Sequence, residues 1–178
     1  DLMIQSDVGD VTLTELTLAS ALDVSLGTGK VSSDGLNAKT VSVKSNVGDI
    51  KCQNWTVEQY LFLETKTGDV ILDNSTVDED LIAQSKVGKV KVMNTQAKTM
   101  AFTTKTGDII MELLTADNYK LSTNVGDIRG SLRGEQQEYT ILTATVVGQS
   151  NPTSQKGTTE KEVSASTQTG DIKLTFQP

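Results

Sequence analysis

Apolar and polar residues alternate in short runs on both sides of a recurring glycine. Val41 and Val43 alternate with polar residues before Gly48, and Ile50 and Cys52 do so after it. The residue two places after this glycine is Val or Ile in every repeat except one, which has Ser. A period of two predicts β-strands, and no stretch keeps the 3.6-residue period of a helix over three turns. The pattern therefore predicts two short strands for each glycine.

These glycines return at nearly constant intervals along the chain. Consecutive members of the set are 19 to 22 residues apart. The set comprises Gly9, Gly29, Gly48, Gly68, Gly88, Gly107, Gly126, Gly148 and Gly170. Self-similarity with such a period is typical of stacked repeats, in which each unit buries its apolar face only against a neighbour. We therefore expect one all-β domain over residues 1–178, a parallel β-solenoid (β-helix) of about nine coils, in which the strands of each coil stack on those of the next coil in sequence.

Each coil needs two corners if its two strands are to share one interior. Glycine is expected at the first corner, because it accepts positive φ without a Cβ penalty, and the Asp that usually follows hydrogen-bonds nearby backbone. The second corner is expected at Asn54, Asn74 and Asn94, whose amides can form a ladder. Crossovers between parallel strands are overwhelmingly right-handed, so we expect a right-handed solenoid.

Composition narrows the class of protein without naming a partner. The formal net charge is −7, which disfavours nucleic acid, since that partner calls for a basic face. One cysteine and no histidine exclude an internal disulfide and a cysteine–histidine metal cluster. No apolar run has the length of about 18 residues that a membrane span needs. The sequence begins inside a repeat, so we expect it to be part of a longer protein.

The aspartates that follow the glycines are the first candidate site. This row comprises Asp10, Asp49, Asp69, Asp108, Asp127 and Asp171. Stacked carboxylates are able to bind Ca²⁺, an ion with oxygen ligands, but the nonapeptide pattern of calcium-binding β-rolls is absent. Lys30 and Lys89 occupy the same row and relieve repulsion without a metal. We expect corner roles for these aspartates, with no metal and no cofactor.

A second row lies two residues before the glycines. Lys66, Lys86 and Lys105 occupy its centre, and Asn46 and Asn124 its ends. Lysines about 4.8 Å apart on neighbouring strands can attract an anionic glycan or teichoic acid. The alternative, which we favour, is that they neutralise the adjacent carboxylates on a solvated face, where charge rows contribute little.

The third candidate is apolar. Phe62, Ile82 and Ala101 lie six residues before their glycines, at outward-facing positions of the predicted strands. Scattered apolar residues are normal on a surface, but three in register indicate a small exposed patch. Of the surfaces considered, this patch is the one where we expect a glycan or protein partner on a cell surface to bind.

Two further sets of reactive residue types fit the core better than a catalytic site. Cys52 occupies the position held elsewhere by Leu72 and Val92, so we expect it to be buried with these two as its stacked neighbours. A nucleophile needs exposure and an adjacent base instead. A row of hydroxyls lies three residues before the glycines: Ser6, Ser45, Thr65, Ser85, Thr104, Thr123, Thr145 and Thr167. Equivalent positions cannot all be nucleophiles, so we expect an internal ladder.

The repeat resembles that of the bacterial "putative adhesin" family, whose function is unknown. The matching segments include residues 45–50, 65–70 and 123–128, each with Val or Thr before Gly-Asp and Ile or Val after it. The resemblance covers nearly the whole chain and implies a β-solenoid in an exported or membrane-tethered envelope protein. Some family members are linked to envelope stress. No ligand and no catalytic residue carries over, and the pattern breaks at residues 149–152, which lead into a polar loop.

Three classes of function remain after these arguments. The resemblance and the row-like surface favour a non-catalytic bacterial module, extracellular or held at the envelope by segments outside this sequence. A polymer-forming scaffold is the alternative, but it needs open, matching ends. Pro178 and the irregular eighth repeat favour a capped module. A polysaccharide-active β-helix enzyme is disfavoured because such enzymes build their clefts from long loops. In this sequence only residues 134–138 and 151–162 lengthen a repeat, and neither segment has a convergent catalytic set.

Overall fold

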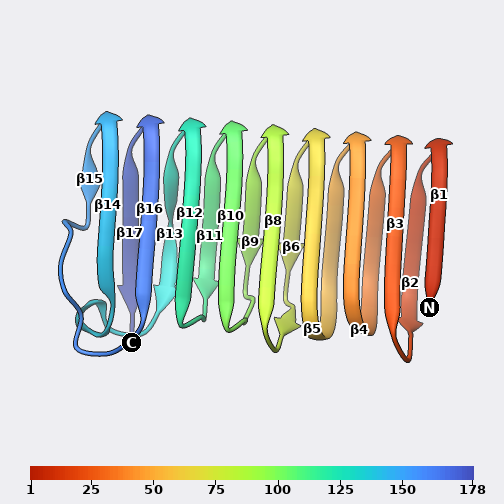
Figure 1. Ribbon diagram of the computed structural model, residues 1–178, viewed down its shortest axis with the longest axis horizontal. Coiled ribbons are helices and arrows are strands. Elements are labelled where there is room, and N and C mark those ends of the chain that lie inside the picture. The colour runs from red at the N-terminus through yellow and green to blue at the C-terminus, as the bar shows by residue number, and fades with distance from the viewer.

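The computed structural model describes residues 1–178 and is a parallel β-solenoid of about nine turns. The strand before each corner glycine belongs to what we call the pre-glycine face, and the strand after it belongs to the post-glycine face. Like strands lie side by side along a rod, with the N-terminal coil at one end (Figure 1). The sequence-based prediction of an all-β solenoid is confirmed.

The pairings between these strands are parallel throughout. The pre-glycine face contains β1 (Leu2–Val8), β3 (Ala21–Thr28), the second halves of β4 (Val31–Val47) and β5 (Ile50–Thr67), β8 (Asp80–Val87), β10 (Thr99–Thr106), β12 (Asn118–Val125), β14 (Thr140–Val147) and β16 (Glu162–Thr169). The post-glycine face contains β2 (Val11–Thr17), the first halves of β4 and β5, β6 (Val70–Asp73), β9 (Val90–Met93), β11 (Ile109–Leu114), β13 (Ile128–Arg133), β15 (Ser150–Asn151) and β17 (Ile172–Gln177). The remaining elements are β7 (Thr76–Val77) and the single-turn 3-10 helix η1 (Gln136–Glu138).

Inward residues of both faces form one continuous core. It contains 38 buried residues in a single cluster, which include the predicted apolar positions such as Leu61 and Leu63. Trp55 is also buried, and its indole Nε1 donates a hydrogen bond to the hydroxyl of Ser33 at 3.0 Å. Because every coil contributes to the same core, each coil depends on its neighbours for burial.

The second corner of the coil lies at the recurring asparagines, as the sequence pattern predicts. Asn54, Asn74 and Asn94 all have positive φ, between 46° and 59°, a conformation that Asn tolerates better than most residues. Their amides form the expected ladder in one step only: Asn74 Nδ2 donates to Asn54 Oδ1 at 2.6 Å, whereas Asn94 bonds to Asp73. Leu113 adopts the same positive φ; as a large apolar residue, it carries no turn signal in the sequence.

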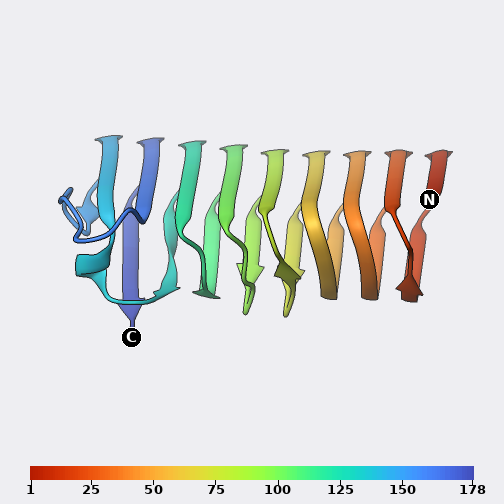
Figure 2. The ribbon, with the colours of Figure 1, turned by 60° about the horizontal axis from the view of Figure 1, so that its bottom comes forward.

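The order of the coils departs from the order of the chain at its end. β16 pairs with β12 on one side and β14 on the other, and β17 lies likewise between β13 and β15. The Gly170 coil is therefore inserted between the Gly126 and Gly148 coils, as the dark blue strands show in Figures 1 and 2. The expectation that each coil stacks on the next one in sequence is wrong for these last two.

Strand length explains this exchange. β15 has two residues, whereas β17 pairs with β13 over its whole length, from Ile128 to Arg133. If the Gly148 coil lay directly on the Gly126 coil, most of β13 would lose its neighbour on that side. Backbone groups that are removed from water without a partner destabilise the fold. The longer terminal strand therefore occupies the inner position, and the short one covers the end.

The two ends of the stack differ as a result. The outer edge of β14 is covered by loop 152–161, since Ile141 N donates to Gln155 O at 2.8 Å and Gln155 N donates back to Ile141 O at 2.9 Å. At the other end, β1 and β2 each pair with one neighbour. Pro178 follows β17, which is not the last strand of the stack. The expectation that this proline closes an end is wrong, because the loop does so.

Gly68→Ala is expected to destabilise the protein far more than Gly9→Ala. Both glycines have φ near +140°, so each substitution introduces a strain of roughly 1–3 kcal/mol. A Cβ on Gly68 would also collide with the carbonyl oxygen of Gly48, whereas the nearest atom to a Cβ on Gly9 is 3.7 Å away. Urea unfolding measures the difference. Equal loss of stability in the two variants would show that the approach between coils is not what requires glycine.

Candidate functional site

The aspartate row caps the backbone of neighbouring coils. Asp49 Oδ1 accepts the N–H of Asp69 at 3.0 Å, and Asp69 Oδ1 accepts the N–H of Lys89 at 2.9 Å. The same bond joins Lys30 to Asp10, Asp127 to Asp108, Asp171 to Asp127 and Gln149 to Asp171. No three Asp, Glu, Cys or His side chains lie close enough together to hold a metal ion. These carboxylates therefore act at the corners, as expected from turn chemistry.

Cations at the corners and on the post-glycine face offset part of this negative charge. Lys89 Nζ lies 3.1 Å from Asp69, and Arg129 lies 3.2 Å from Asp108. At the last corner, the hydrogen bond from Lys173 lowers the pKa of Asp171, and the backbone N–H of Gln149 lowers it further. All of these pairs are partly exposed, so their individual contributions to stability are small.

The hydroxyl row is an internal ladder, as predicted. Thr65 is fully buried, and its Oγ1 donates to the carbonyl oxygen of Gly48 at 2.9 Å. Equivalent bonds to the glycine of the adjacent coil are made by Ser45, Ser85, Thr104, Thr123, Thr145 and Thr167. Ser6, in the terminal coil, donates to Val8 O instead. These hydroxyls satisfy carbonyl groups at the corners, where the backbone leaves the regular ladder.

Cys52 is buried, as predicted, but one of its expected neighbours is wrong. It pairs with Leu72 on one side and with Ser33 on the other. Val92 pairs with Leu72 and is therefore two coils away from the cysteine. Each residue in the middle of the stack has one neighbour in the preceding coil and one in the following coil. The prediction for Cys52 took both from the coils that follow it. Burial raises the pKa of the Cys52 thiol, which disfavours the reactive thiolate.

The lysine row lies on the solvated surface near the corners. Lys66, Lys86 and Lys105 are all exposed, and none of them forms an ion pair. The carboxylates that they were expected to neutralise pair with other cations. These three ammonium groups are therefore free to meet an anionic partner, although solvent screening limits the contribution of each.

The predicted apolar patch is enlarged by an aromatic neighbour. Phe62 lies opposite Ile82 in the sheet, and Ile82 lies opposite Ala101. Tyr60, two residues before Phe62, stacks on it with ring centroids 6.3 Å apart and an interplanar angle of 7°. Lys44 Nζ lies 5.4 Å from the centre of the Phe62 ring, within the range of a cation–π interaction.

We call Lys44, Tyr60, Phe62 and Ile82 the aromatic patch. Tyr60 is 37% exposed, and the other apolar members are partly exposed. Burial raises the pKa of Tyr60, and the charge of Asp80 raises it further, so the phenol stays neutral. Sequence reasoning missed Tyr60, although its position two residues before Phe62 places both on the same side of a strand. Nothing in the sequence pattern marked Lys44 as a member of this patch, because lysines are common at outward-facing positions of strands.

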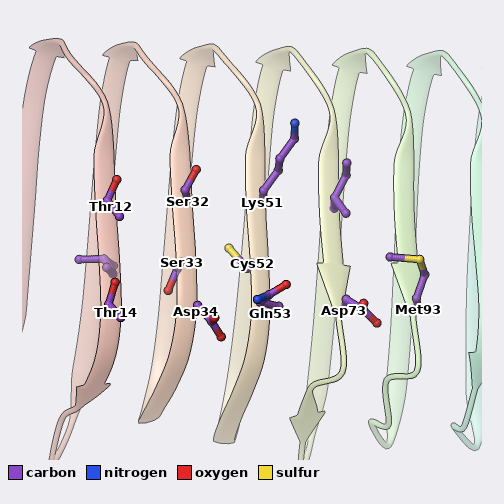
Figure 3. Close-up of a pocket in the computed structure, with 12 residues that line it drawn as sticks. Thr12, Thr14, Ser32, Ser33, Asp34, Lys51, Cys52, Gln53, Asp73 and Met93 are labelled. Carbon is purple, nitrogen blue, oxygen red and sulfur yellow. The ribbon is translucent and has the colours of Figure 1, made fainter.

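A shallow hollow lies on the opposite, post-glycine face. Its volume is about 350 Å³, and it extends across β2, β4, β5, β6 and β9. Its labelled side chains in Figure 3 include Thr12, Asp34, Lys51, Gln53, Asp73 and Met93. The amide of Asn54 donates to Asp34 at 2.6 Å and lowers the pKa of its carboxyl group. This hollow was not predicted, since it depends on side-chain sizes on five strands.

Thr65→Val is expected to lower the free energy of unfolding by roughly 1 kcal/mol, because it removes the hydrogen bond that the buried Thr65 hydroxyl donates to the partly buried Gly48 carbonyl. Val has nearly the same shape, so packing changes little. Thr103→Val is the matched control, since Thr103 is exposed and donates no side-chain hydrogen bond. Chemical denaturation compares the two variants. If Thr65→Val is no less stable than the control, the hydroxyl row does not support the corners.

Comparison with known families agrees with this architecture. The family model Toastrack DUF4097 matches residues 1–175, almost the full length of the chain. Its members form a β-solenoid-like repeat family of unknown function. No curated protein and no solved structure matches the chain. The coverage of the match and the repeated corners together place this chain in one family: it belongs to the Toastrack DUF4097 family.

Proposed function

We propose that this chain is a non-catalytic binding module of the bacterial cell envelope and that the aromatic patch is its contact surface. The stacked pair of Tyr60 and Phe62 is the observation that carries the proposal. Aromatic side chains supply large contact area at low entropic cost, and they are enriched at binding hot spots. Here β5 holds both rings on a rigid sheet, so little further ordering is needed when a partner binds.

Several observations support a role without catalysis. Carboxylates and hydroxyls recur in rows, and most of them hydrogen-bond the backbone of the adjacent coil, as Asp69 and Thr65 do. A catalytic site needs different groups that converge on one reacting atom. The Cys52 thiol is buried, which does not suit a nucleophile.

The class of partner follows from the surroundings of the aromatic patch. The rings offer an apolar platform, and Lys44 and Asp80 supply charges beside it. Glycans and protein surfaces both combine apolar faces with hydrogen-bonding groups. The unpaired lysine row, Lys66, Lys86 and Lys105, lies on the same face and adds affinity for an anionic partner. Each exposed lysine contributes little, so binding of an anionic partner would depend on several coils together.

The envelope location is proposed from the resemblance of the repeat to the bacterial adhesin-like family. Both an adhesin and an envelope-stress module need a surface that binds partners outside the cytoplasm. The structure has no helix with the length and apolarity needed to cross a bilayer. Attachment to the envelope would therefore rest on segments other than those described here. Fractionation of cells that express the natural gene product, with protease accessibility of the solenoid as readout, tests this location.

A polymer-forming scaffold is less well supported. End-to-end stacking in one direction needs both terminal coils to offer free strand edges. Loop 152–161 covers β14 through the paired hydrogen bonds of Ile141 and Gln155. The beginning of β14, at one end of the rod, is therefore closed to a second copy.

Phe62→Ser combined with Ile82→Ser is expected to weaken partner binding at least tenfold, since loss of two patch residues removes hot-spot contacts of more than about 1 kcal/mol each. Binding to a glycan array and to bacterial envelope fractions provides the measurement. Ser164→Ala combined with Ser166→Ala is the control, because these residues lie on the same face but on β16, away from the patch and without a change of charge.

Unchanged binding by the patch variant, with the fold intact by circular dichroism, would remove the aromatic patch as the contact surface. Turnover of a polysaccharide that is abolished by one point substitution in a folded variant would overturn the non-catalytic proposal itself.

A further inference from the structure

Three lysines on the pre-glycine face lie side by side without an ion-pair partner. Lys66, Lys86 and Lys105 belong to β5, β8 and β10, which are neighbours in the middle of the rod (Figure 1). The residues that precede them pair in register, as Thr65 does with Ser85. The three side chains therefore leave strands that are about 4.8 Å apart, and all three are exposed.

The cations of the post-glycine face differ from this row. Each of them lies 2.9 to 3.7 Å from a carboxylate oxygen: Lys51, Lys91, Arg129 and Lys173. The chain has 23 Asp and Glu residues against 16 Lys and Arg residues. A shortage of carboxylates therefore does not explain why the lysine row is unpaired.

The unpaired row lowers the stability of the protein on its own. Like charges on neighbouring strands repel, and Lys86 has another lysine on each side. The repeat does not require this arrangement, since Asn46 and Asn124 occupy the same position on the flanking strands β4 and β12. Local arrangements that reduce stability without an evident structural gain are expected at functional sites.

The neighbourhood of the lysine row selects a narrow ligand. The aspartate row begins three residues further along the chain, so that Asp69 follows Lys66 around the corner. A broad anionic surface, such as a membrane or duplex DNA, would meet both rows, whereas a single chain can lie along the lysines alone. We propose that Lys66, Lys86 and Lys105 bind a linear acidic polysaccharide that has a carboxylate on every sugar unit and lies along the rod axis.

The spacing of the lysines suits carboxylates on consecutive sugars. One sugar unit of an extended polysaccharide is about as long as the distance between neighbouring strands, so each carboxylate can meet one ammonium group. The phosphates of a polyol phosphate chain are further apart and match the row less well. The amides of Asn46 and Asn124 can donate hydrogen bonds to sugar hydroxyls at the two ends. This ligand class rests on the binding role proposed above, but it does not need the aromatic patch.

Polygalacturonate immobilised on a sensor surface is the probe for this row. The triple variant Lys66→Gln/Lys86→Gln/Lys105→Gln is expected to bind about tenfold more weakly than the unmodified chain at low salt, since three modest ion pairs are lost. The difference should shrink at high salt, where these charges are screened. Hyaluronan, which has a carboxylate on alternate sugars, should compete less well than soluble polygalacturonate at equal carboxylate concentration.

A second triple variant separates the lysine row from net charge. Lys91→Gln/Lys98→Gln/Lys173→Gln makes the same change of charge, but these lysines lie off the pre-glycine face and pair with carboxylates. It should bind polygalacturonate nearly as the unmodified chain does. The Phe62→Ser/Ile82→Ser variant should also keep this binding. Failure of the aromatic patch therefore leaves the lysine site standing, and the reverse also holds.

The repulsion within the row has its own measurement, which needs no ligand. Lys86→Gln should raise the urea midpoint of the free protein at low salt, and the increase should disappear at high salt. Lys120→Gln is the control, because Lys120 lies opposite Ala101 and Ser164 and has no lysine beside it. It should leave the midpoint unchanged.

Several results would overturn the proposal. The first is no binding of polygalacturonate at low salt, or an equal loss of binding in the two triple variants. The second is tighter binding of a glycerol phosphate polymer or of anionic lipid vesicles, which would assign the row to another ligand. Loss of binding in the Phe62→Ser/Ile82→Ser variant would place the polymer on the aromatic patch instead. A Lys86→Gln variant no more stable than the Lys120→Gln control would show that the row is not strained.

Discussion

The close approach of backbones at the glycine corners is the constraint on which this fold depends. At Gly68 and Gly88, a Cβ atom would collide with the carbonyl oxygen of the preceding corner. Only glycine permits this contact and the positive φ at the same residue. Once the corners are this close, the hydroxyl of the inward Ser or Thr reaches the glycine carbonyl, and the Asp carboxylate reaches the next N–H. The corners thus bind adjacent coils through side chains as well as through the ladder.

This constraint explains why so much of the fold could be predicted from the sequence. A residue required at one corner is required at every corner, so Gly, Asp and Ser or Thr repeat with the period of the coil. The buried Leu61 and Leu63 follow from the same alignment. The exchange of the last two coils could not be predicted this way, because their repeats align equally well in either order. That order depends on how short β15 is. The break in the repeat pattern at residues 149–152 shows that this coil is irregular, but it does not give the length of its strand.

The candidate surface was predictable only in part for a related reason. Phe62 and Ile82 were found because they occupy equivalent positions, whereas Tyr60 has Thr40 and Asp80 as its neighbours and belongs to no apolar row. Tyr60 stands out because the repeats differ at its position, whereas the ladders of hydrogen bonds consist of residues that the repeats share. Alignment of repeats therefore detects the structural ladders readily and detects sites less well.

Disulfide trapping tests the account of coil order most directly. Lys120 lies opposite Ser164 in the sheet, and Leu142 lies opposite Ser164 on its other side. In a Cys52→Val background, Lys120→Cys with Ser164→Cys should form a disulfide readily, since neighbouring parallel strands are about 4.8 Å apart, within the range that the bond accepts. Lys120→Cys with Leu142→Cys should not, because one strand separates them. Ready cross-linking of the second pair and not the first would contradict the inserted coil.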